Sequence, residues 1–233
     1  MKTVRTIQRS GFHARDRVMG MVGAWTAFAV NEAYAVTSGL AFLSAKSSSD
    51  PISDPYLSIM SALVVLMAPF LLITMVAVHA YAAPEHKSYS LAALAFMILL
   101  TGITSIVNFA LFSVARQPIP ASSMWVASFI PSSWPELPQA LDFFAWDWFF
   151  ALSMLLAAPV FRGGRLENAV RTLMIFTAVL CLLGLVWLPI SPAQANTIGI
   201  IGWGVAGPIV CLLLANLFTR IEPDPDLSLT AHR

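Results

Sequence analysis

Six long apolar segments constrain this sequence more than any other feature. Each has roughly the 20 mostly apolar residues that an α-helix needs to cross the hydrocarbon core of a bilayer. The segments are 18–43, 57–82, 89–115, 140–161, 170–190 and 197–219. Of the 233 residues, 58% are hydrophobic and only 11% are charged. We therefore expect an all-α fold, a polytopic transmembrane helix bundle with about six spans in a single domain over residues 18–220.

Positive charge orients these spans. Most Lys and Arg residues lie in the N-terminal arm 1–17, in the turn 84–87, in the loop 162–171 and at position 220. With six spans they all fall on one side, and the opposite side has only Lys46 and Arg116. The positive-inside rule then places both termini in the cytoplasm. We expect a multi-pass protein of the endoplasmic reticulum in a eukaryote or of the inner membrane in a bacterium, with a disordered cytoplasmic tail over 221–233.

The loop 116–138 differs from the other connections. It contains five prolines, which exclude a spanning helix, yet it is apolar and contains Trp125 and Trp134. We expect it to lie at the outer interface with both indoles at headgroup level. It could form a lid over a site, in which case Trp125 contacts the substrate, or it could be an anchor without a gating role.

The fourth apolar segment opens with Leu141–Phe150, which reads LDFFAWDWFF and sets two carboxylates among six aromatic rings. A charged side chain at the centre of a bilayer costs about 2.5–3.5 kcal/mol on insertion scales, so such a residue is read first as part of a site. Asp142 lies near the outer surface, where it could simply be exposed to water. Asp147 lies deeper among the rings and is the stronger candidate for a buried acid.

Residues from other segments fall at a similar depth, counted at about 1.5 Å per residue. Glu32 lies at or just beyond the midplane of the first segment, while Asn108 and Trp203 lie in the outer halves of the third and sixth. Asn108 ends a polar stripe at helical spacing that consists of Thr101, Thr104, Ser105 and Asn108. Such groups could also form interhelical hydrogen bonds that only stabilise helix packing, by about 0.6 to 2 kcal/mol each.

We assign catalytic roles to Asp147 and Glu32, as an acid and its carboxylate partner in either order, and to Asn108, which would orient one of them or a substrate oxygen. The residues expected to contact the substrate are Trp146, Trp148, Trp203, Asp142, Phe143 and Trp125. The aromatic residues could equally belong to a lipid-facing belt.

Several chemistries lack their residues in this sequence. There is no lysine inside an apolar segment to hold retinal, no Walker loop and no HExxH pair, so we predict neither a cofactor nor a metal site. No basic stretch is interleaved with aromatic residues, which disfavours a nucleic-acid partner. Cys181 and Cys211 lie far apart inside apolar segments, and we expect both to be core residues.

In length, short loops and acids in the outer half of the membrane, the chain resembles the small polytopic integral membrane terpene cyclases of meroterpenoid pathways. The stretch 150–171, FALSMLLAAPVFRGGRLENAVR, is also similar to uncharacterised small bacterial membrane proteins. The cyclase resemblance is one of architecture and supplies no motif residue. It implies protonation of an epoxide or alkene on a prenyl chain by an acidic residue, without a metal.

The residues themselves point to the same chemistry. Burial disfavours the charged form of a carboxyl group, so a close pair can present one acid and one carboxylate for general acid–base catalysis. Aromatic faces attract a developing cation. We therefore predict a membrane cyclase or isomerase of a lipophilic prenyl substrate (terpenoid or meroterpenoid). The alternatives are a proton or small-solute transporter or channel, and a non-catalytic membrane subunit or lipid-binding module. The oligomeric state is left open.

Overall fold

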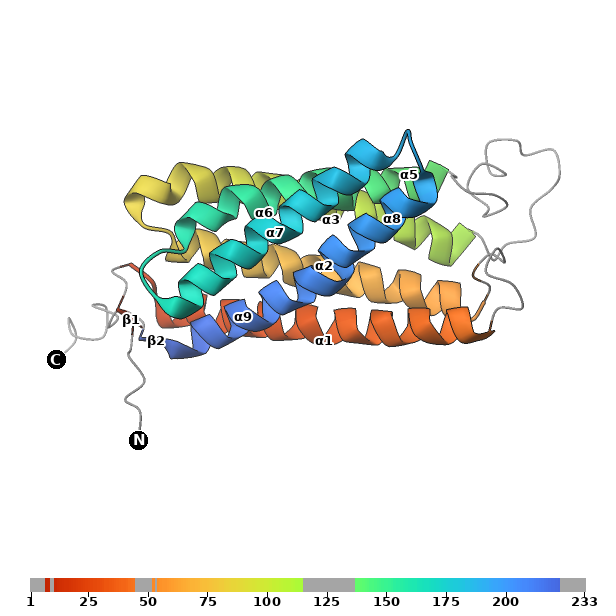
Figure 1. The fold of residues 1–233 in the computed structure, drawn as a ribbon. Helices are drawn as coiled ribbons and strands as arrows, with labels where there is room; N and C mark the ends of the chain where they lie inside the picture. The colour runs from red at the N-terminus through yellow and green to blue at the C-terminus, as the bar shows by residue number, and fades with distance from the viewer. Residues whose placement is uncertain (1–6, 9–10, 45–51, 53, 115–136, 223–233) are drawn as a thin grey trace.

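The computed structural model describes residues 7–8, 11–44, 52, 54–114 and 137–222. Within these ranges all the long elements are helical (Figure 1). The longest are α1 (Ala14–Ser44), α2 (Tyr56–Tyr81), α3 (Lys87–Val114) and α7 (Arg165–Trp187). A short 3-10 turn, η1 (Pro84–His86), precedes α3.

Two further rods of the bundle are each composed of several helical pieces. The first runs through α5 (Leu137–Phe144), the π-helical η2 (Ala145–Phe150), α6 (Ala151–Ala157) and the 3-10 turn η3 (Ala158–Val160). The second runs through α8 (Pro192–Ile200), the π-helical η4 (Ile201–Ala206) and α9 (Gly207–Arg220). Each rod therefore contains a π-helical segment between two α-helical ones.

The six rods alternate in direction and pack side by side in one bundle (Figure 1). Each contacts the rod that follows it in the chain, and α1 contacts α9. The short connections after α2, η3 and α7 make consecutive rods antiparallel neighbours. The predicted all-α bundle is confirmed at this level.

Five of the rods are long and apolar enough to cross a membrane, as in a multi-pass membrane protein. They are Tyr56–Tyr81, Pro84–Ser113, Leu137–Val160, Arg165–Trp187 and Gln194–Arg220. The sixth rod, α1, has 31 residues and is long enough. Its polar pair Asn31 and Glu32 lies within the apolar stretch and lowers the hydropathy there. The sequence predicts six spans. Five rods are both long and apolar enough, and α1 is the predicted span that is not among them.

The two ends of the described chain meet at one end of the bundle. Strand β1 (Ile7–Gln8) pairs in parallel with β2 (Ile221–Glu222). Arg17 donates from Nε to the carbonyl of Phe218, 3.1 Å away. Phe12 and Ile221 are both buried, at 0% and 1% exposure. Residues that we assigned to the basic arm and to the tail therefore belong to the packed bundle.

Helix α1 approaches its neighbours through small residues. A Cβ atom added at Gly23 would lie 2.7 Å from Thr74 Oγ1 and 3.0 Å from the backbone nitrogen of Thr74. A Cβ at Gly20 would lie 2.7 Å from Phe218 Cδ2. Small residues at such crossings let helix backbones pack closely in membranes. The inward face of α1 therefore depends on glycine.

Gly23→Ala is expected to lower the free energy of unfolding by about 1–3 kcal/mol, the usual cost of overpacking. The matched control is Gly39→Ala in the same helix, because a Cβ there meets no atom within 4 Å. The control should leave stability unchanged or raise it by up to about 1 kcal/mol through helix propensity. Thermal unfolding in detergent, followed by circular dichroism, compares the two; equal midpoints would contradict the close approach.

Candidate functional site

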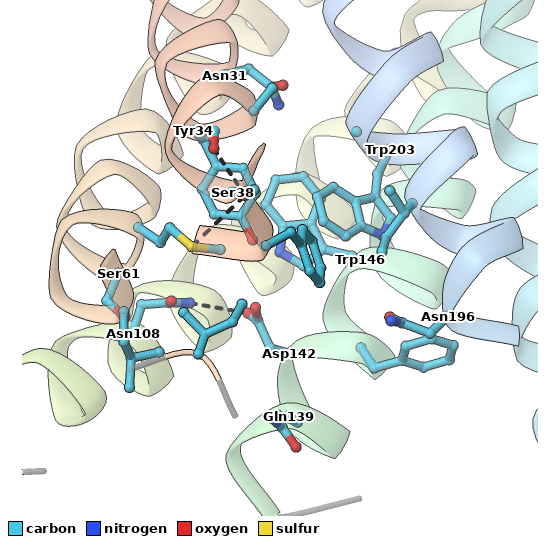
Figure 2. Close-up of a pocket in the computed structure, with 18 of the residues that line it drawn as sticks. Asn31, Tyr34, Ser38, Ser61, Asn108, Gln139, Asp142, Trp146, Asn196 and Trp203 are labelled. Carbon is cyan, nitrogen blue, oxygen red and sulfur yellow. Dashed lines mark hydrogen bonds between the residues drawn. The ribbon is translucent and has the colours of Figure 1, made fainter. Parts of the chain in front are cut away.

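A cavity of about 550 Å³ lies in the half of the bundle remote from β1 and β2. Its lining residues come from α1, α2, α3, the α5–η2 rod and the α8–η4 rod, together with Ile52. Its polar and indole-bearing lining residues are Asn31, Tyr34, Ser38, Ser61, Asn108, Gln139, Asp142, Trp146, Asn196 and Trp203 (Figure 2). Pockets of about 300–1,000 Å³ are the usual size for small-molecule sites.

Asp142 is the carboxylate of this cavity. Its Oδ1 accepts hydrogen bonds from Thr104 Oγ1 at 2.5 Å and from Asn108 Nδ2 at 3.3 Å (Figure 2 draws the Asn108 bond). Asn108 Nδ2 is also 2.9 Å from the carbonyl of Thr104, which fixes the amide orientation. The Trp146 indole also lies close enough to interact with this carboxyl group. Two donors of α3 therefore fix Oδ1, and the carboxyl group forms part of the cavity lining.

Helical spacing explains why these groups meet. Thr104 and Asn108 are four residues apart on α3 and so share a face. Asp142 and Trp146 are likewise four residues apart on the α5–η2 rod. Trp146 Nε1 donates to Thr104 Oγ1 at 3.2 Å, so Asp142 and Trp146 both form a hydrogen bond with Thr104. The two faces are thus held together by a chain of hydrogen bonds from the indole through the hydroxyl to the carboxylate.

Three aromatic rings stand beside this chain. The ring centroids of Trp146 and Trp203 are 5.4 Å apart, and those of Tyr34 and Trp203 are 6.3 Å apart. Figure 2 shows all three between α1 and the η4 segment, close to Asp142. Aromatic faces attract cations through their quadrupole. The cavity therefore combines one carboxylate with an aromatic wall.

Both indoles come from π-helical segments, Trp146 from η2 and Trp203 from η4. A π-helical turn holds an additional residue and therefore rotates the side chains that follow it. Such turns are rare and frequently occur at functional sites. The two π segments contact each other through these indoles. The aromatic wall thus depends on two local departures from α-helical geometry.

Asp147 lies elsewhere. It is 0% exposed and does not line the cavity. Within the described ranges its carboxylate oxygens form no hydrogen bond of regular geometry, but the Cys181 thiol lies beside the carboxyl group and interacts with it. A Cβ added at Gly199 would lie 2.6 Å from Asp147 Oδ1, so the carboxyl group packs directly on the backbone of α8. The glycine at 199 leaves the space that Asp147 occupies.

The structure does not bring together Asp147, Glu32 and Asn108, the three residues predicted to be catalytic. Asn108 bonds Asp142, Asp147 packs on α8, and Glu32 is exposed on the outer face of α1. The predicted pairing of Asp147 with Glu32 is therefore corrected. The physical reason is rotation about the helix axis: depth follows from residue count, but the direction of a side chain changes by about 100° per residue.

Only some of the six residues expected to contact a substrate line the cavity. Trp146, Trp203, Asp142 and Phe143 line the cavity. Trp148 does not, because it lies on the outside of η2 with 37% exposure. The predicted lid over 116–138 and its Trp125 lie outside the described residues, apart from the start of α5.

Sequence reasoning missed two participants. Tyr34 belongs to the aromatic wall, and Thr104 connects Trp146 to Asp142. The polar stripe on the third apolar segment contained the signal for Thr104, since this residue precedes Asn108 by one turn. Asp142, which could have been a water-exposed residue at a helix start, is hydrogen-bonded within the cavity instead.

Comparisons of the chain with protein-family models, with curated proteins and with solved structures found no match. Among the described residues, no group of three or more His, Cys, Asp or Glu side chains is placed to hold a metal ion. The chemistry that this site offers is that of a hydrogen-bonded carboxyl group beside aromatic rings.

The two aspartates should differ in their effect on stability. Asp142→Leu leaves the Thr104 hydroxyl and part of the Asn108 amide without an acceptor, which should cost about 1–3 kcal/mol of unfolding free energy. Asp147→Leu removes a buried carboxyl group whose neighbour among the described residues is only the weakly hydrogen-bonding Cys181 thiol, so stability should be unchanged or higher. Thermal unfolding of both variants in the same detergent tests this, and a more damaging Asp147→Leu would contradict the described contacts.

Proposed function

We propose that this protein is a membrane-embedded enzyme that cyclises or isomerises a lipophilic prenyl-type substrate by proton transfer from Asp142. One observation carries the proposal: Asp142 lines the cavity, and its Oδ1 is held by Thr104 and Asn108 of α3. General acid–base catalysis needs a positioned group of this kind within hydrogen-bond reach of the substrate.

The proposed reaction balances without a co-reactant. Asp142, in its protonated form, gives its proton to the oxygen of an epoxide on the prenyl chain, and the C–O bond breaks to leave a cationic carbon. A double bond of the same chain attacks that carbon and forms a C–C bond. The positive charge then lies on the other carbon of that double bond. A carbon next to this cation loses a proton to the Asp142 carboxylate, which forms a new double bond and restores the protonated Asp142. The product is an isomer of the substrate, and no metal is required.

The other cavity residues have roles that suit this reaction. Thr104 and Asn108 hold the carboxyl group in one orientation. The rings of Tyr34, Trp146 and Trp203 provide faces for a cationic intermediate, at about 0.5–2 kcal/mol for each favourable contact. An apolar enclosure also keeps water from capturing the cation. A carboxyl group beside several aromatic rings favours this chemistry over a purely structural role.

Access from the lipid supports a lipophilic substrate. Ala35 and Gly39 of α1 line the cavity and are exposed, and the same holds for Ile200 and Val205 of the α8–η4 rod. The cavity therefore opens sideways between these two rods. We infer that a prenyl chain enters from the bilayer through this gap.

Packing in the other half of the bundle argues against a transport path. Phe12, Tyr81, Phe161 and Phe218 form an aromatic cluster there with ring centroids 5.7–6.4 Å apart, and all four are at most 1% exposed. The Tyr81 hydroxyl donates to Glu167 Oε1 at 2.5 Å. A channel or transporter needs a route to both faces of the membrane, and this cluster fills the centre of the bundle at one of them.

We further infer that α1 is the sixth span and that the end of the bundle with β1 and β2 faces the cytoplasm. Every Lys and Arg in the described ranges lies within two helical turns of that end, in agreement with the positive-inside rule. These residues are Arg15, Arg17, Lys87, Arg162, Arg165, Arg171 and Arg220. The cavity then lies in the outer half of the membrane.

The orientation predicts the behaviour of topology reporters. A reporter fused after Arg233 that is active only in the cytoplasm should be active, and the same reporter inserted between Ser44 and Tyr56 should be inactive. A reporter that works only outside the cytoplasm should give the reverse pattern. Termini on opposite sides of the membrane would contradict six spans.

The catalytic role is tested with purified protein in lipid nanodiscs and a set of epoxidised prenyl lipids, with isomer formation followed by liquid chromatography and mass spectrometry. Asp142→Asn should lower turnover by about 10²- to 10⁴-fold, the usual contribution of general acid–base catalysis. Asp147→Asn is the matched control and should turn over substrate as the unaltered protein does. Full activity of Asp142→Asn would contradict the proposal, as would loss of activity in Asp147→Asn alone.

A further inference from the structure

The outer face of α1 bears an exposed stripe of residues that are three or four positions apart. The stripe consists of Val18, Val22, Trp25, Ala29, Glu32, Val36, Leu40 and Leu43, all of them exposed. We call it the α1 stripe. Its mean spacing is close to the 3.5-residue period of helices that pair with a left-handed twist. The helix packs on the rest of the bundle with its other face, which includes Gly20, Gly23 and Ala27.

Glu32 lies in the middle of the α1 stripe. It follows Val18 by fourteen residues and precedes Leu43 by eleven, which places it about 21 and 16 Å from these two residues along the axis. A glutamate side chain is too short to reach water from there. Glu32 forms no hydrogen bond or ion pair with any residue of the described ranges, although acids at membrane depth are normally paired.

A second copy of the chain fits this stripe best. A heptad stripe is self-complementary about a two-fold axis, and a residue at its centre meets its own counterpart there. A carboxyl group both donates and accepts, so two Glu32 side chains that hold a proton between them satisfy each other. The small residue Ala29 lies one turn away and permits close approach of the two helices.

We propose that two copies of this chain associate through the α1 stripe, with the two Glu32 side chains hydrogen-bonded to each other. The proposal rests on α1 being a membrane span but not on the chemistry of Asp142. The cavity residues Tyr34 and Ser38 lie on the opposite side of α1 from the stripe, at about 100° per residue. The cavity residues Ala35 and Gly39 flank the stripe, but dimerisation is measured without substrate and can therefore be tested separately from turnover.

The stripe is tested by disulfide crosslinking of the full chain in its native membrane. Trp25→Cys and Val36→Cys place a thiol on the stripe, and the control Ile106→Cys places one on the lipid-facing side of α3, where Ile106 is 72% exposed. The native Cys181 and Cys211 are buried, so the unaltered protein sets the background. Both stripe variants should give a product of twice the chain mass on oxidation, and the control should not.

Equal crosslinking of stripe and control variants would overturn the proposal. So would a product of some other mass, which would mean that a different membrane protein covers the stripe. Failure of the prenyl epoxide assay would leave this result unaffected, because the crosslinking needs no substrate.

The role of Glu32 is tested by single-molecule photobleaching of labelled protein in phosphatidylcholine vesicles. Glu32→Leu should weaken dimerisation by roughly 3- to 30-fold, the range for interhelical hydrogen bonds in membranes. Glu32→Gln keeps a group that donates and accepts and should dimerise nearly as strongly as the unaltered chain. Undiminished dimerisation of Glu32→Leu would overturn the proposed contact, and a monomeric unaltered chain would overturn the dimer.

Discussion

The hydrogen bonds that Thr104 and Asn108 donate to Asp142 are the interaction on which the candidate site depends. A bilayer core offers no water to a carboxyl group, so a polar group there must find its partners within the protein. These bonds join α3 to the α5–η2 rod and bring the Trp146 indole to Thr104. They fix one oxygen of the carboxyl group at the cavity, which is the positioning that the proposed proton transfer requires.

The three acids of the predicted site have three different surroundings. Asp142 is hydrogen-bonded at a cavity, Asp147 is buried between Gly199 and the Cys181 thiol, and Glu32 faces outward from α1. A sequence presents them as similar, since each is a carboxylate in an apolar segment. Their different neighbours are the reason that we propose different tasks for two of them, proton transfer for Asp142 and association of two copies for Glu32.

Apolar length predicted the helical bundle. Residue count placed Asn108 and Trp203 in the outer halves of their segments and Asp142 near the outer surface, and all three line the cavity. The direction in which these side chains point could not be predicted, because it depends on the rotation of each helix about its axis. The π-helical segments η2 and η4 add to that rotation and have no clear sequence signal. The sequence therefore favoured Asp147, whereas the cavity contains Asp142.

The most direct test is a structure of the protein with a bound aza analogue of a prenyl chain, in which an ammonium nitrogen replaces the cationic carbon. Analogues of this kind bind more tightly than substrates because they resemble the charge of the transition state. We predict that the nitrogen lies within about 4 Å of Asp142 Oδ2, at the distance of an ion pair, and against the rings of Trp146 and Trp203. An analogue bound beside Asp147, or bound outside the cavity, would contradict the account.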